Sequence, residues 1–106
     1  GQLEKAKAEL LQSLTLRPNI PEVLNNLGTV QVKLGDTAAG LRLFEKAVTL
    51  RPNYALARFN LAGASEATNP KRAVSEYETY LALVEGIPEE EARIAHVKER
   101  VKALKR

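Results

Sequence analysis

Cysteine is absent from the 106-residue chain, and few of its side chains are aromatic. Disulfides, zinc–thiolate sites and thiol catalysis are therefore excluded, while cytoplasm and periplasm are equally compatible locations for a soluble chain. No apolar run approaches the roughly 18 residues that a membrane-spanning helix needs, so no membrane partner is expected. Leucine and alanine dominate instead, a composition typical of closely packed helices. The aromatic residues are Phe44, Tyr54, Phe59, Tyr77 and Tyr80.

Charge of one sign is nowhere concentrated. The net charge is +3, from 16 Lys and Arg against 13 Asp and Glu. The most basic stretch, residues 98–106, contains Glu99 and has no interleaved aromatic residue. It is therefore interpreted as a solvated helix face, with contact to RNA or anionic lipid as the weaker alternative, and no nucleic-acid partner is expected. Its basic residues are Lys98, Arg100, Lys102, Lys105 and Arg106.

Candidates for catalysis or metal binding are sparse. The one histidine, His96, has no aspartate or second histidine near it in sequence, so it is interpreted as an ordinary surface or half-buried side chain. Glu89, Glu90 and Glu91 could suggest a cation site, but adjacent carboxylates on a helix point in different directions, and a helix start favours acids. No glycine-rich phosphate loop is present. The sequence predicts no enzyme, no metal site and no cofactor.

A period of 34 residues organises the chain. Residues 15–19 read TLRPN, and residues 49–53 repeat the same five letters. A fixed period is decisive for the fold, because each copy must adopt the same local structure. Apolar residues recurring every three or four positions predict helices between the breaks. The predicted helices cover residues 3–16, about 21–34, 37–50, 55–68, 71–85 and 88–106.

Proline, glycine and asparagine mark the helix ends. Pro18 and Pro52 end the first and third helices, because the residue before proline is pushed out of the helical region. Gly35 suits a left-handed cap, and Asp36 and Asn69 can cap the helices that follow them. The last helix has an apolar stripe and one predicted ion pair, between Glu89 and Arg93. The stripe consists of Ile94, Val97, Val101 and Leu104.

Two helices of about 13 residues with a short turn between them, repeated every 34 residues, resemble the tetratricopeptide repeat. The family has a large residue, a leucine and a small residue, then a second large residue, an alanine, an aromatic and a proline. The matching positions are Leu24, Leu27, Gly28, Gln31, Gly40, Phe44 and Pro52. The next copy has Arg58, Leu61, Ala62, Ser65, Ala73 and Tyr77, and the preceding copy has Ala6, Leu10 and Pro18.

Some positions depart from the family pattern. Gly40 stands where the family favours alanine and should cost about 1 kcal/mol of helix stability. Arg58 replaces a large aromatic residue, and its stem is expected to pack while its charged head reaches water. Gln31 and Ser65 also replace an aromatic residue.

The resemblance implies an all-α fold, a right-handed α-solenoid of antiparallel helix pairs with about 2.5 repeats and a C-terminal capping helix. Residues 1–20 would be the second helix of a truncated first repeat, and residues 21–54 the complete repeat. Residues 55–87 would be a shortened repeat and residues 88–106 the cap. Gly1 aligns with Gly35, so the chain is expected to be a piece of a longer protein.

The resemblance also implies a scaffold that binds a peptide or helix of a partner protein. The first helix of each repeat lines the concave side in this family. Asn25, Asn26 and Asn60 could bind the peptide backbone through their amides, and Phe59 could form an apolar pocket wall. The alternative is that Asn26 and Asn60 stabilise the repeat itself. The implied groove residues are Glu22, Asn25, Asn26, Thr29, Lys33, Leu56, Phe59, Asn60, Gly63 and Glu66.

One sub-family clamps the acidic C-terminal tails of heat-shock chaperones with an asparagine and several basic residues. Leu56 and Asn60 stand at basic places of that pattern, so a two-carboxylate clamp is not expected.

Self-association into a homo-oligomer is the alternative function. The first predicted helix has no partner helix before it, and its apolar face would be open to a second copy. The residues of that face are Leu3, Leu10, Leu11 and Leu14.

Overall fold

The computed structural model describes residues 1–106, which form six α-helices, one short 3-10 helix and no strand. None of the helices is both long and apolar enough to cross a membrane. The elements are α1 (Gln2–Leu16), α2 (Pro21–Lys33), α3 (Thr37–Leu50), α4 (Ala55–Ser65), α5 (Pro70–Val84), η1 (Pro88–Glu90) and α6 (Glu91–Leu104).

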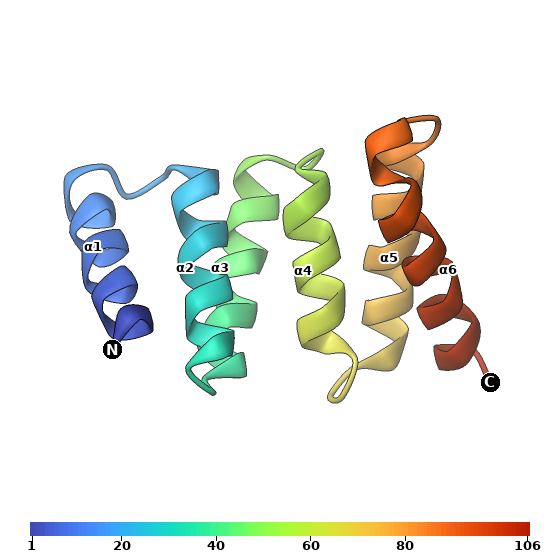
Figure 1. Ribbon diagram of the computed structural model, residues 1–106, viewed down its shortest axis with the longest axis horizontal. Coiled ribbons are helices and arrows are strands. Elements are labelled where there is room, and N and C mark those ends of the chain that lie inside the picture. The colour runs from blue at the N-terminus through green and yellow to red at the C-terminus, as the bar shows by residue number, and fades with distance from the viewer.

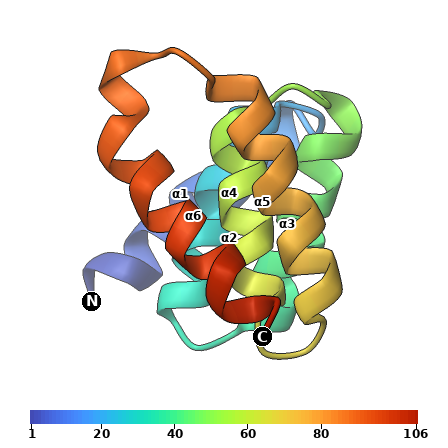
Figure 2. The same cartoon turned by 90° about the vertical axis from the view of Figure 1, so that its right-hand side faces the viewer.

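The helices follow one another along the long axis of a molecule with extents of 40 × 26 × 23 Å (Figure 1). Neighbours in sequence are antiparallel neighbours in space. Seen from the end, α3 and α5 lie on one side, with α2 and α4 next to them and α6 leaning out on the opposite side (Figure 2). The fold is the predicted all-α solenoid of helix pairs, closed at its C-terminal end by α6.

The predicted caps are confirmed. The side chain of Asp36 accepts a hydrogen bond from the amide of Ala39 at 3.0 Å, and the side chain of Asn69 accepts one from the amide of Arg72 at 3.1 Å. Gly35 has a φ of 94°, in the left-handed region where a side chain would be strained. The glycine and capping residues that the sequence places between the helices therefore predict most helix ends correctly.

Two predicted helices differ from the observed ones. α4 ends at Ser65 rather than at residue 68, because the amide of Glu66 turns back to the carbonyl of Gly63 in a tighter turn. The last segment is divided, since η1 precedes α6. The predicted pair between Glu89 and Arg93 is wrong: Arg93 contacts Glu90 at 3.0 Å instead.

Two apolar clusters form the interior, one in each half of the solenoid. The first lies between α2, α3 and α4, and α1 adds Leu14 at its edge. The second lies between α4, α5 and α6, where Val97 is buried and the rest of the predicted α6 stripe packs around it. The first cluster contains Leu24, Phe44, Ala47, Val48, Ala57 and Leu61. The second contains Ala62, Ala73, Tyr77, Tyr80, Val84 and Val97.

Close approach of α2 and α3 depends on two glycines. A Cβ atom on Gly28 would lie 2.5 Å from the ring of Phe44. A Cβ atom on Gly40 would lie 2.5 Å from Val32 Cγ2 and 2.8 Å from the backbone oxygen of Gly28. The expectation that Gly40 merely weakens its helix is therefore incomplete, because the packing leaves no room for alanine.

The expectation for Arg58 is wrong in one respect. Its guanidinium does not reach into water but donates to Glu76 at 2.8 Å and, through Nε, to the carbonyl of Pro52 at 3.0 Å. The Arg58 and Glu76 side chains are 19% and 11% exposed. A buried charge is stable only when it is paired, and Glu76 on α5 supplies the partner.

Candidate binding groove

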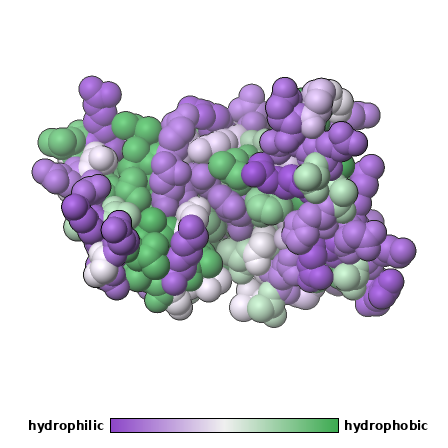
Figure 3. Space-filling view, viewed as in Figure 1, coloured by the Kyte–Doolittle hydropathy of each residue, from purple (hydrophilic) through white to green (hydrophobic).

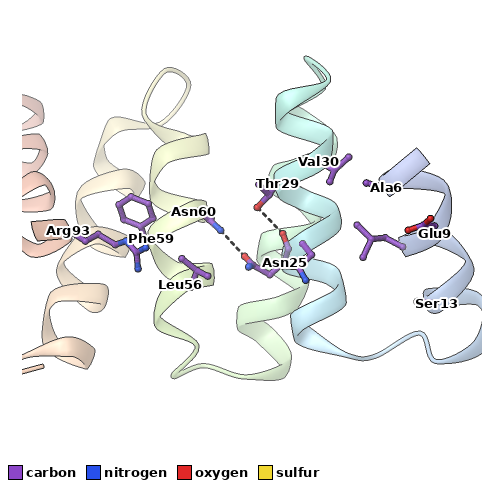
Figure 4. Close-up of a pocket in the computed structure, with 12 residues that line it drawn as sticks. Ala6, Glu9, Ser13, Asn25, Thr29, Val30, Leu56, Phe59, Asn60 and Arg93 are labelled. Atoms are coloured by element: carbon purple, nitrogen blue, oxygen red, sulfur yellow. Dashed lines mark hydrogen bonds between the residues drawn. The ribbon is translucent and has the colours of Figure 1, made fainter. Parts of the chain in front are cut away.

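A groove of about 740 Å³ crosses the face formed by α2 and α4. α1 lines one side of it, and Arg93 of α6 stands at the other (Figure 4). Apolar surface gathers over α1 and α2, whereas the surface over α6 is largely hydrophilic (Figure 3). The lining residues are Ala6, Glu9, Leu10, Ser13, Asn25, Asn26, Thr29, Val30, Leu56, Phe59, Asn60 and Arg93.

A second hollow of about 440 Å³ continues the groove toward the C-terminal ends of α2 and α4. The two hollows share Thr29, Phe59 and Asn60, so they form one continuous surface. The second hollow is lined by Thr29, Val32, Lys33, Thr37, Phe44, Phe59, Asn60, Gly63, Ala64 and Ala67.

Asn25 and Asn60 connect the two helices of the groove floor. The Asn60 Nδ2 atom donates to the Asn25 Oδ1 atom at 2.9 Å, and Asn25 is only 1% exposed (Figure 4). Asn26, in contrast, is exposed and lines the groove. One residue along a helix turns the side chain by about 100°. The stabilising pair is thus Asn25 with Asn60 rather than Asn26 with Asn60.

Phe59 is held in place by a cluster of rings. Its centroid lies 6.1 Å from that of Tyr77, 5.6 Å from that of Tyr80 and 6.3 Å from that of the exposed His96. The guanidinium of Arg93 lies 5.2 Å from the centre of the Phe59 ring, a cation–π distance. Phe59 is therefore both a wall of the groove and a member of the packing beneath it.

Ion pairs and tyrosine hydroxyls fasten α6 beside the groove. Glu66 accepts hydrogen bonds from Arg100 and from the hydroxyl of Tyr77, and these contacts, with that of Arg100 the largest, hold the pKa of Glu66 below its ordinary value. The hydroxyl of Tyr80 donates to Glu90 at 2.5 Å. Burial, followed by this bond, raises the pKa of Tyr80 to about 12.

Some of the remaining predicted groove residues line the two hollows, and others make contacts elsewhere in the molecule. Lys33 and Gly63 line the second hollow, and Leu56, which is 37% exposed, lines the first. Glu22 pairs with Arg51 across the α2–α3 repeat, so its carboxylate is already occupied. Glu66 faces α6, as described above, and lines neither hollow.

Sequence reasoning missed the contribution of α1 and α6 to the groove. Ala6, Glu9 and Ser13 line it from α1, and Arg93 lines it from α6. Leu10, which the sequence places on the predicted self-association face, also lines the groove. The register offered a signal, since Ala6 and Leu10 occupy the places that Gly40 and Phe44 occupy one period later.

The predicted self-association face is not one continuous surface. Leu14 packs against the first core cluster, Leu10 lines the groove, and Leu3 is half-buried. Leu11 is exposed, as is Leu16. Self-association through these leucines remains a prediction.

Residues 21–54 match the family model of the tetratricopeptide repeat. The chain therefore contains a tetratricopeptide repeat at these residues. In structure the chain is similar to the Yersinia enterocolitica type III secretion translocator chaperone SycD, with a TM-score of 0.92 and 16% identity, over 99% of this chain and 73% of SycD. SycD has also been solved in complex with a peptide of the translocator YopD, with a TM-score of 0.91, 16% identity and coverage of 99% and 81%.

PcrH, solved in complex with the chaperone binding region of PopD, has a TM-score of 0.87 and 19% identity, over 99% of this chain and 80% of PcrH. The first repeat domain of Spaghetti, bound to the HSP90 peptide SRMEEVD, has a TM-score of 0.80 and 19% identity, over 96% of this chain and 82% of that domain. These likenesses show that the tetratricopeptide fold extends over the whole described chain.

Proposed function

We propose that the chain is a scaffold that binds a peptide segment of a partner protein in the groove over α2 and α4. The observation that carries the proposal is the groove itself: an open surface of mixed apolar and amide side chains, supplied mainly by α2 and α4. Pockets that bind ligands combine apolar walls with a few well-placed polar groups. Peptide complexes of SycD, of PcrH and of the Spaghetti domain support the same function for this fold.

The groove offers both kinds of contact. Leu56, Val30 and Phe59 supply apolar walls, and the exposed amide of Asn26 can both donate to and accept from a peptide backbone. Asn25 is poorly placed for that role, because it is only 1% exposed and its Oδ1 atom accepts from Asn60. Affinity would come from burial of the peptide's apolar side chains. The hydrogen bonds of Asn26 would fix the position of the peptide backbone along the groove.

Charge disfavours a strongly acidic ligand. The ionisable residues lining the two hollows are Glu9, Lys33 and Arg93, and the last is paired with Glu90. A groove with so little surplus positive charge has little electrostatic attraction for a run of carboxylates. The partner segment is therefore expected to be mainly apolar and nearly neutral.

Selection from a random peptide library displayed on phage tests the proposal with the purified chain. Selected peptides should be enriched in apolar residues, and Leu56→Asp should weaken their binding at least about tenfold, because it places a charge in the apolar wall. Leu50→Asp is the matched control. Leu50 is 43% exposed and lies at the end of α3, outside both hollows.

Circular dichroism must show that both variants keep the helical content of the parent chain. Selected peptides whose binding is equally strong for the parent chain and for Leu56→Asp would contradict the proposal. Loss of binding in Leu50→Asp alone would move the site to the α3 side of the molecule.

A further inference from the structure

Three glycines lie within helices, and packing requires two of them. Gly28 and Gly40 stand where α2 and α3 approach each other, and a Cβ atom on either would lie 2.5 Å from a neighbouring side chain. Gly63 on α4 differs, because a Cβ atom there would meet only the Tyr77 hydroxyl, at 3.8 Å, an ordinary contact. Its φ is not positive, so its backbone conformation does not require glycine either. Neither packing nor backbone geometry therefore accounts for Gly63, although glycine lowers helix stability relative to alanine.

Gly63 is exposed and lines the second hollow, between α2 and α4. The residues of α4 in this hollow are smaller than those at the same places one period earlier on α2. Gly63 stands in the place of Thr29, and Ala67 in the place of Lys33. Phe44, which is only 2% exposed, lines the hollow from the interior of the molecule. The hollow thus has an apolar wall, and at Gly63 it reaches the backbone of α4.

Lys33 is the one ionisable residue among those that line the second hollow. It is exposed, and no ion pair of the chain includes it. In the first hollow, by contrast, Glu9 brings a negative charge, and Arg93 is paired with Glu90. The second hollow therefore combines an apolar wall with one unpaired positive charge. This arrangement is complementary to an apolar side chain that has a carboxylate near it.

We propose that the second hollow binds one large apolar side chain of an extended partner peptide, and that Gly63 keeps the hollow open for it. A larger side chain at this place would stand on the surface of α4 that the peptide must contact. Lys33 favours a peptide with a carboxylate two residues from the apolar side chain, since residues two apart lie on the same side of an extended chain. This inference rests on the proposed function, because the hollow belongs to the same groove.

The probe is a synthetic heptapeptide, acetyl-AEAFAEA-amide. Its phenylalanine is the large apolar side chain, and a glutamate two residues away on either side serves both chain directions. Titrated into the isotope-labelled chain, it should shift the backbone amide resonances of Lys33, Gly63 and Ala67 in a saturable way, with a Kd in the millimolar range. Replacing the phenylalanine of the peptide by alanine should weaken binding at least about tenfold. Replacing both glutamates by glutamine should weaken it up to about fivefold, because the ion pair with Lys33 is exposed.

Gly63→Leu should weaken binding of the heptapeptide at least about tenfold, and Gly63→Ala, which adds a single methyl group, should weaken it less. Ala82→Leu is the matched control, because Ala82 is exposed on α5 and lines neither hollow. Urea unfolding separates a blocked hollow from an unfolded chain. The midpoint for Gly63→Leu should be at least as high as for the parent chain, since leucine has a more favourable helix propensity than glycine.

Weaker binding by a variant that is no less stable would support the inference, because loss of structure cannot cause it. Equal binding of the heptapeptide to the parent chain and to Gly63→Leu would overturn the inference. So would shifts confined to the first hollow, or no saturable shift below about 10 mM peptide. Equal binding of the glutamate and glutamine peptides would overturn the role of Lys33. If library peptides still bind in a Leu56-dependent way, the proposed function survives each of these failures.

Discussion

Replacing Gly40 by alanine separates helix propensity from packing. Helix propensity alone predicts a gain, because glycine in a helix interior costs about 1 kcal/mol relative to alanine. The structure predicts the opposite sign. The added Cβ would lie 2.5 Å from Val32 Cγ2 and 2.8 Å from the Gly28 carbonyl oxygen, and the second contact is with backbone that cannot rotate away. α2 and α3 must therefore move apart.

Overpacking of this kind costs about 1–3 kcal/mol. Alanine has a helix propensity about 1 kcal/mol more favourable than that of glycine, which offsets part of this cost. The free energy of unfolding of Gly40→Ala should therefore be lower by about 1 kcal/mol. Gly63→Ala is the matched control, since Gly63 is also helical but its Cβ would meet only the Tyr77 hydroxyl at 3.8 Å, an ordinary contact. That variant should gain up to about 1 kcal/mol.

Urea unfolding followed by circular dichroism, with linear extrapolation to water, measures both variants. The two free energies of unfolding should differ by about 2 kcal/mol, which corresponds to roughly 10 °C or more in Tm for a chain of this size. If Gly40→Ala is as stable as Gly63→Ala, the close approach of α2 and α3 is not as tight as described, and the argument from packing fails.

Three further predictions follow from the polar contacts. Asn25→Ala should destabilise by about 1–2 kcal/mol and show a coupling energy with Asn60→Ala in a double-mutant cycle measured by urea unfolding. Arg58→Ala should cost about 2 kcal/mol in the same assay, because it leaves Glu76 largely buried without its closest partner. Glu66 contributes stability above its ordinary pKa of 4.5 that is lost as the pH falls through its lower folded value. In Glu66→Gln, the decline in unfolding free energy on acidification should therefore be shallower.

The order and type of the helices could be read from the chain because local signals repeat. Pro18 and Pro52 end helices by sterics that involve only adjacent residues, and Asp36 and Asn69 cap helices through amides three residues away. Such interactions survive in any fold that contains those helices. Because these signals recur every 34 residues, the sequence predicts similar helix pairs stacked on one another.

The candidate groove was predicted only in outline. Residues of α2 and α4 line the two hollows, and their role in binding a partner stays a prediction. The sequence did not indicate which of two neighbouring asparagines bonds to Asn60. Asn25 and Asn26 are identical in type, and only the packing of α2 decides which of them turns toward α4. Arg93 lines the groove because α6 packs beside it. The sequence predicted only that this segment caps the solenoid.

The sequence by itself determined the 34-residue repeat and the helix boundaries within a few residues, since the periodicity and the residues that end helices are local properties. Tertiary structure alone decided that close packing requires Gly40 and that the Arg58 guanidinium pairs with Glu76 instead of reaching water. Each of these depends on the distance between atoms far apart in the chain. Close packing sets the distances between these atoms. A small change in side-chain volume, or in the rotation of a helix about its axis, can therefore turn a stabilising contact into a clash.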